Sequence, residues 1–180
     1  MKDFSLQLYS LREVPTLRQR MEIAAQAGYT GVEFAGYDGI AGPEMRRLLA
    51  SLGLRGTGSH IAYDALRDDL DGCVRYCLEA GITSAACPGC EMNDRDQALA
   101  QAEFLEACAE RFGAEGIPFA YHNHAHEFAD AGNGETLFDV LLHNTSKLGA
   151  ELDVFWAAYA GGGSAGLYSD LCRAGAAAPF

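Results

Sequence analysis

Residues 27–34 read "AGYTGVEF": the end of a helical stretch, a glycine turn, and a short apolar run typical of a buried strand. The same order recurs around Gly53, Gly81, Gly116 and Gly149. Glycine is favoured directly after a helix because it adopts the left-handed backbone conformation without steric cost. The repeat therefore predicts strands and helices that alternate along the chain. Such alternation predicts an α/β protein with a parallel sheet and right-handed crossovers.

The pattern can be followed through six strand–helix units. The expected strands cover about residues 4–10, 31–36, 55–61, 83–89, 115–124 and 149–156. The expected helices cover about residues 15–26, 43–52, 66–79, 94–113, 135–147 and 164–174. Two folds fit this alternation, a doubly wound open sheet and a (β/α)8 barrel. No G-x-G-x-x-G follows the first strand, which argues against a dinucleotide-binding fold.

The composition indicates one folded domain over residues 1–180, with 49% hydrophobic residues and a formal net charge of −12. Nucleic-acid and anionic-membrane surfaces need clustered lysine and arginine, so the acidic balance argues against both kinds of partner. A small-molecule partner is not excluded, because its site depends on local charge.

No apolar run approaches the ~20 residues of a membrane span, and the N-terminus lacks the apolar region of a signal peptide. The six cysteines are scattered through a chain that is large enough to form a core without disulfides. We therefore expect reduced cysteines and a cytoplasmic protein. The "CPGC" of residues 87–90 is a C-x-x-C, but its place after a fourth strand is unlike that of a redox motif, which opens a helix after a first strand.

Polar residues gather at the carboxyl ends of the expected strands, namely Glu33, His60, His122, His124 and Asp153. In a barrel these ends form one mouth, where side chains from different strands converge. This convergence favours the barrel over the open sheet. A closed barrel needs about eight units and typically ~250 residues, so we expect a barrel that is truncated after about six units.

A metal site is one interpretation of "YHNHAHEF" (121–128). His122 and His124 alternate along a strand and so point the same way, and Asp153 ends the next strand. Imidazole and carboxylate together form a partial ligand set for Mn²⁺, Co²⁺, Mg²⁺ or Zn²⁺. In the alternative interpretation these histidines form hydrogen bonds in a loop and Asp153 caps a turn. The spacing alone does not separate the two.

Catalytic and substrate roles are expected for other polar residues near these strand ends. Glu33, His60 and His124 are candidates for general acid–base catalysis, although Glu33 could instead be a buried salt-bridge partner and His60 a rim residue. We assign substrate contacts to Asn123, Glu127 and Trp156. For Glu127 the alternatives are a residue that orients an imidazole and a plain surface residue, and for Trp156 the alternative is core packing.

Several motifs, in this order, resemble the sugar phosphate isomerase/epimerase family of xylose isomerase-like TIM barrels. They are "LYSLRE" (8–13), "GYTGVEFAGY" (28–37), "GSHI" (58–61), "YHNHAHEF" (121–128) and "ELDVFWAAYAG" (151–161). The superfamily also includes inosose dehydratases, keto-sugar epimerases and the endonuclease IV type of AP endonuclease. The resemblance covers residues 4–162 and is less specific for the substrate than for the fold.

The resemblance implies roles for single residues. Asp153 matches the sixth-strand aspartate that ligates a divalent metal, and His122 takes the place of the usual fifth-strand glutamate ligand. His60 and Glu33 match residues of the third and second strands near the site. Relatives supply two further ligands from a seventh and an eighth strand, which this sequence does not reach. We therefore expect the chain to be a fragment that is inactive and binds metal weakly.

The resulting expectation is a metal-dependent sugar or sugar-phosphate isomerase or epimerase that moves a proton next to a carbonyl. The alternatives are a keto-sugar or inosose dehydratase or lyase, and a non-catalytic sugar-binding module. An AP endonuclease is disfavoured, because "CPGC" stands where that type has a fourth-strand histidine and because the chain is acidic. The open edges of a six-unit barrel make a homo-oligomer a further expectation.

Overall fold

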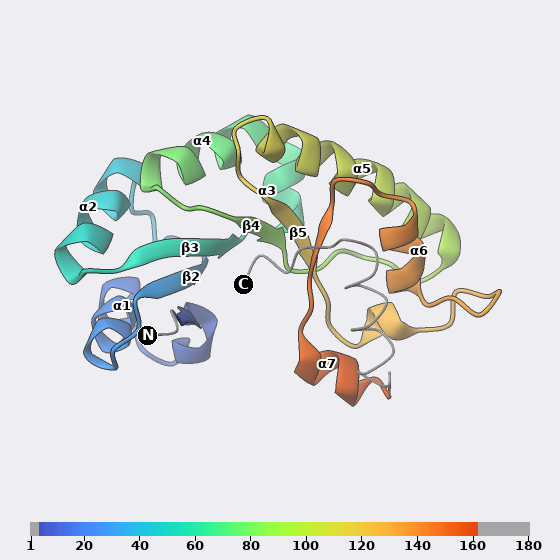
Figure 1. Cartoon of the computed structure of the whole chain (residues 1–180), viewed down its shortest axis with the longest axis horizontal. Coiled ribbons are helices and arrows are strands. Elements are labelled where there is room, and N and C mark those ends of the chain that lie inside the picture. The colour runs from blue at the N-terminus through green and yellow to red at the C-terminus, as the bar shows by residue number, and fades with distance from the viewer. Residues whose placement is uncertain (1–3, 162–180) are drawn as a thin grey trace. The chain divides into compact units, whose positions relative to one another are not determined.

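The computed structural model describes residues 4–161, in which strands and helices alternate (Figure 1). The strand order in the sheet follows the chain, β1-β2-β3-β4-β5-β6. A doubly wound sheet reverses its direction at a switch point, whereas the strands of a (β/α) barrel follow one another in chain order. The order confirms the barrel class over the doubly wound alternative. The described residues form two compact units, divided between Ala85 and Ala86.

The N-terminal unit is built on three parallel strands. Its elements are β1 (Ser5–Gln7), the 3-10 helix η1 (Leu8–Leu11), α1 (Leu17–Gln26), β2 (Gly31–Ala35), α2 (Gly42–Leu52), β3 (Arg55–His60), α3 (Tyr63–Asp68) and α4 (Leu70–Ala80). β2 pairs in parallel with both β1 and β3. The core includes Val32 and Phe34 of β2, Met21 of α1 and Met45 of α2, none of which has exposed surface. Burial of these side chains supplies the main driving force for this unit.

The C-terminal unit repeats the same local plan. Its elements, from the strand at the boundary onward, are β4 (Ala85–Cys87), α5 (Arg95–Gly113), β5 (Phe119–His122), the 3-10 helix η2 (His126–Phe128), α6 (Leu137–His143), β6 (Gly149–Glu151) and α7 (Val154–Tyr159). β5 and β6 are parallel, with His122 opposite Glu151. α5 packs against both α6 and β5. Phe112 and Phe138 are fully buried in this unit.

Four of the five expected glycine turns are confirmed. Gly28, Gly53, Gly81 and Gly116 have φ angles of +87°, +68°, +75° and +75°. These angles lie in the left-handed region, where a side chain would strain the backbone. The expectation at Gly149 is wrong, because this residue begins β6 and makes no turn. A Cβ atom there would meet the Phe119 carbonyl oxygen at 3.4 Å, an ordinary van der Waals contact, so the strand does not require glycine at this position.

Other boundaries also differ from expectation. The first strand ends at Gln7, and residues 8–11 form a 3-10 helix. The single helix expected over 66–79 is two helices, because Asp69 has φ −152° and its side chain accepts a hydrogen bond from the Gly72 amide to cap α4. The sixth strand ends at Glu151 rather than at residue 156. The helix expected at 164–174 lies outside the described residues.

Within residues 4–161, none of the helices combines the length and the apolar character that a bilayer crossing requires. The cysteines of this part of the chain are free thiols: Cys73, Cys77, Cys87, Cys90 and Cys108.

Candidate functional site

A row of three residues crosses the sheet of the N-terminal unit. Gln7 of β1 lies opposite Glu33 of β2, and Glu33 lies opposite Gly58 of β3. The register between β2 and β3 shifts between Val32 and Glu33, which leaves one extra residue on β3. Such a bulge redirects side chains. Here it sets Glu33 opposite glycine, so the three positions share one face of the sheet near the carboxyl ends of the strands.

The Glu33 carboxylate is held in place by its two neighbours in this row. The Gln7 side-chain amide donates a hydrogen bond of 2.9 Å to Glu33 Oε2, and its own oxygen accepts one from the Tyr9 amide at 2.9 Å. The second bond defines which end of the Gln7 amide faces Glu33. A Cβ atom at residue 58 would overlap Glu33 Oε1. The Glu33 carboxylate, and not a ligand, therefore fills the space beside Gly58.

His60 ends β3 and faces the same carboxylate. Its Nε2 lies 3.7 Å from Glu33 Oε2, and the two side chains are 11% and 15% exposed. The structure thus brings together two of the residues that the sequence suggested for catalysis, Glu33 and His60. A partly buried carboxylate beside an imidazole is a suitable arrangement for accepting and passing on a proton.

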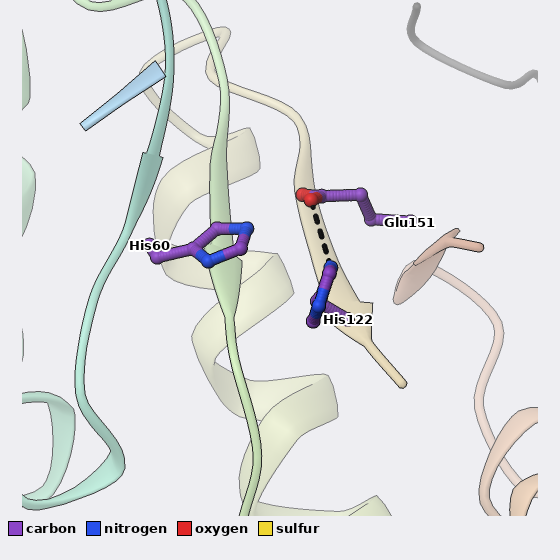
Figure 2. A group of neighbouring side chains, drawn as sticks. All are labelled: His60, His122 and Glu151. Atoms are coloured by element: carbon purple, nitrogen blue, oxygen red, sulfur yellow. Dashed lines mark hydrogen bonds and ion pairs between the residues drawn. The ribbon is translucent and has the colours of Figure 1, made fainter. Parts of the chain in front are cut away.

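In the C-terminal unit, one imidazole lies between two carboxylates. His122 Nδ1 is 3.0 Å from Glu151 Oε1, and His122 Nε2 is 3.9 Å from Asp153 Oδ2. Figure 2 shows the His122–Glu151 pair; it also draws His60, which belongs to the N-terminal unit. The pair follows from the strand register, since His122 and Glu151 are directly opposite at the ends of β5 and β6.

The two ring nitrogens of His122 have different neighbours. Nδ1 shares a hydrogen bond of 3.0 Å with Glu151 Oε1, and in the tautomer that carries its proton on Nδ1 the imidazole is the donor of this bond. That tautomer has its lone pair on Nε2, on the side of Asp153. Two atoms bound to one ion at ~2.1 Å are at most about 4.2 Å apart, and the 3.9 Å between His122 Nε2 and Asp153 Oδ2 satisfies this limit. These two donors form part of a ligand set for a divalent metal, and Glu151 lies where it can orient the imidazole.

Asp153 caps a helix with one carboxylate oxygen and faces His122 with the other. Its Oδ1 accepts a hydrogen bond of 3.0 Å from the Trp156 amide and so caps the N-terminus of α7. Its Oδ2 is the atom that faces His122. The sequence predicts Asp153 as part of the sixth strand, but in the structure it lies two residues after the end of β6 and is the N-cap of α7. The helix cap fixes the carboxylate plane, which directs the second oxygen to the candidate metal site.

His124 and Trp156 lie beside this cluster. The ring centroids of His122 and His124 are 5.1 Å apart, and those of His124 and Trp156 are 5.5 Å apart. Burial, followed by the proximity of His122, lowers the pKa of His124. A lowered pKa favours the neutral imidazole, which is the form that binds metals or accepts a proton.

Asn123 and Glu127 have no exposed surface. Asn123 forms hydrogen bonds with the backbone of Asp153, and Glu127 accepts hydrogen bonds from the Tyr121 hydroxyl at 2.8 Å and the His124 amide at 2.9 Å. Neither side chain offers an exposed polar atom to a substrate. Both instead connect the segment after β5 to its surroundings.

The C-x-x-C motif lies next to this network but has the properties of ordinary thiols. Burial raises the pKa of Cys87 to about 12 and that of Cys90 to about 11. Reactive and metal-binding cysteines need the thiolate, which these raised pKa values disfavour. The Cys90 amide donates to the Tyr121 hydroxyl at 3.3 Å, so this segment contributes to the support of Glu127.

Sequence reasoning missed Gln7, Gly58 and Glu151. Only the two-residue spacing in "ELD" (151–153) points to Glu151, since residues two apart share a face of a strand. Gln7 and Gly58 carry no local signal, because their importance depends on the register with β2.

Three solved structures are similar to this chain along most of its length. A sugar phosphate isomerase/epimerase from Parabacteroides distasonis has a TM-score of 0.80 and 23% identity, over 94% of this chain and 71% of that one. An AP endonuclease of family 2 from Brucella melitensis has a TM-score of 0.73 and 19% identity, over 95% and 76%. An IOLI protein with a bound zinc atom has a TM-score of 0.71 and 12% identity, over 89% and 66%.

The chain has the fold of the xylose isomerase-like TIM barrels. At these identities the likeness establishes the fold alone, and proteins with this fold differ in activity. No protein-family model matches the chain, and no curated protein matches it significantly. The comparisons thereby confirm the predicted fold. The roles of the site residues have to be argued from their own contacts and chemistry.

Proposed function

We propose that the protein is a divalent-metal-dependent sugar or sugar-phosphate isomerase or epimerase. The observation that carries the proposal is the His122 imidazole, which lies between Glu151 and Asp153 at the carboxyl ends of β5 and β6. Active sites of (β/α) barrels lie at these strand ends. A structure of the same fold contains zinc and another is a sugar phosphate isomerase/epimerase, which supports both parts of the proposal.

In the proposed site, His122 Nε2 and Asp153 Oδ2 would hold the metal, with Mn²⁺, Co²⁺, Mg²⁺ and Zn²⁺ all compatible with nitrogen and oxygen donors. The bound ion would polarise a carbonyl and the adjacent hydroxyl, which makes the neighbouring carbon-bound proton acidic. Glu151 would hold the proton of His122 on Nδ1, so that the ring would present Nε2 to the ion.

The proton-transfer role is proposed for Glu33. Gln7 fixes Glu33 Oε2 with a hydrogen bond, and His60 Nε2 lies 3.7 Å from the same oxygen. An ionised carboxylate in such a setting accepts a proton from carbon and returns it to the same or a neighbouring carbon. His124, whose lowered pKa favours a neutral ring, is the second candidate for proton transfer. Trp156, beside His124, is proposed to contact the sugar.

The test is proton exchange in D₂O. The protein is incubated with a panel of ketoses, aldoses and their phosphates, with Mn²⁺ or with EDTA, and deuterium at the carbon next to the carbonyl is followed by NMR. Exchange that is lost with EDTA and restored by Mn²⁺ is the expected result for the enzyme, and it would contradict the sequence-based expectation of an inactive fragment. Exchange that is unaffected by EDTA would refute the metal dependence.

The same samples separate the alternatives. A dehydratase or lyase shares the proton abstraction but releases water or a second fragment, so its product has a different mass. A non-catalytic module would bind a sugar equally with and without EDTA and leave the deuterium content unchanged. An acidic net charge of −12 disfavours nucleic acid as substrate, although one similar structure is an AP endonuclease.

A further inference from the structure

Asn123 is one of the few polar residues that the described part of the chain buries completely, and it has no exposed surface. Burying an amide without hydrogen bonds costs free energy, so a buried asparagine is retained where its bonds hold something in place. The partners of Asn123 show what it holds.

The side chain of Asn123 forms a two-way connection to the backbone of Asp153. Its Oδ1 accepts a hydrogen bond of 2.9 Å from the Asp153 amide, and its Nδ2 donates one of 3.2 Å to the Asp153 carbonyl. Nδ2 also lies 3.4 Å from the His124 carbonyl oxygen. Both backbone groups of the candidate metal ligand are therefore bonded to one side chain.

These bonds begin where the sheet ends. The β5–β6 pairing stops at His122 and Glu151, so no ladder bond of the two strands extends to Asp153. Asn123 immediately follows β5, and its amide takes the place of a further pair of ladder bonds. The connection sets the separation of the two chain segments one step beyond the sheet, at the level of the His122–Asp153 pair.

The geometry points to Asn123 as a positioning residue for the metal centre. It fixes the backbone of Asp153, the α7 cap then fixes Oδ1, and Oδ2 is left facing His122 Nε2 at 3.9 Å before any ion arrives. Pre-arranged ligands bind a metal more tightly, because less order has to be created on binding. The inference rests on the proposed function, since it assumes that His122 and Asp153 bind the ion.

The test is Co²⁺ binding by the whole chain, measured by titration of the visible absorption spectrum, which reports the coordination geometry. Asn123→Ala is compared with wild type and with Asn144→Ala. Asn144, an exposed residue, is the control for the loss of an amide–carbonyl hydrogen bond elsewhere, because its side chain donates to the Val140 carbonyl at 2.8 Å at the end of α6. We expect about 10–100-fold weaker Co²⁺ binding and an altered spectrum for Asn123→Ala only.

The possible results distinguish a failure of the positioning role of Asn123 from a failure of the proposed metal centre. Equal affinities and spectra for wild type and Asn123→Ala would overturn the positioning role alone. Absence of Co²⁺ binding by wild type would overturn the proposed metal centre and the inference with it. A loss in Asn144→Ala as large as that in Asn123→Ala would show a general stability effect and would also overturn the inference.

A second measurement does not depend on how the variant folds. In wild-type protein, the bond to Asn123 Oδ1 should protect the Asp153 amide from hydrogen exchange, and Co²⁺ should slow this exchange further. An unprotected Asp153 amide in a folded protein, or a protected one that Co²⁺ leaves unchanged, would contradict the inference.

Discussion

The Glu33 carboxylate occupies the volume in which a side chain at residue 58 would lie. Gly58 is opposite Glu33 in the β2–β3 register, and a Cβ atom there would overlap Glu33 Oε1. The glycine therefore leaves room for the position in which the carboxylate accepts the hydrogen bond from Gln7 and lies 3.7 Å from His60.

Gly58→Ala should reduce turnover while preserving the fold. The methyl group meets the flexible end of a side chain, so the carboxylate moves and the backbone does not have to. A displacement of about 1 Å in a catalytic group can cost on the order of 100-fold in rate, and we expect a kcat loss of about 10–100-fold with little change in KM. The D₂O exchange assay measures the loss of kcat.

Gly113→Ala is the control for this substitution, because a Cβ atom at residue 113 meets nothing within 4 Å. An equal loss of kcat in both variants would exclude the positioning of Glu33 as the cause.

Glu151→Gln should weaken metal binding without unfolding the protein. The amide oxygen can still accept the Nδ1 proton of His122, but the charge that strengthens this bond is lost. Removal of such an orienting carboxylate typically costs about 10–100-fold in metal affinity. Isothermal titration with Mn²⁺ measures the change. An unaltered affinity would show that Glu151 does not act through His122.

Two substitutions at Asp153 should separate its two functions. Asp153→Asn retains an oxygen that can cap α7, whereas Asp153→Ala loses the cap and the ligand together. Both should abolish metal binding, and only the alanine variant should lose about 1 kcal/mol of stability from the missing cap. Metal content by mass spectrometry and urea unfolding report the two effects. Metal content that stays at the wild-type level in Asp153→Ala would refute the ligand assignment.

Glu106 should make stability depend on pH. Burial raises its pKa, but hydrogen bonds from the Ser146 side chain and from the amides of Ser146, Lys147 and Leu148 outweigh this, and the net pKa lies below the ordinary 4.5. The ionised form therefore stabilises the fold fully above the ordinary value, and this contribution is lost as the pH falls through the lowered pKa.

We expect Glu106→Gln to lower the free energy of unfolding by about 1–2 kcal/mol at neutral pH. The difference from wild type should shrink as the pH falls below about 4.5, because the wild-type carboxyl then becomes protonated and resembles the amide. Urea unfolding at a series of pH values measures it. The exposed Glu103 on the same helix provides the control Glu103→Gln, for which a small effect is expected. A difference that is constant with pH would exclude the charge of Glu106 as its origin.

Much of the fold follows from local signals. Glycine after a helix and an apolar run after the glycine are properties of adjacent residues, so the alternation at Gly28, Gly53, Gly81 and Gly116 was predictable. The break at Asp69 and the end of β6 before Asp153 were not, because a side chain that caps a helix competes with an extended or helical continuation. Whether the chain forms the cap or continues the helix or strand depends on the packing around the capping residue.

The sequence by itself determined the strand–helix alternation and the polar residues at or just after the strand ends, among them His60, His122 and Asp153. Only the tertiary structure showed which of these side chains contact one another and which other residues contact them. The register of β2 with β1 and β3 sets Gln7 and Gly58 around Glu33, and that of β5 with β6 sets Glu151 against His122. Register is a relation between distant segments, chosen by burial and by hydrogen bonds across the sheet, so no single stretch of sequence encodes it.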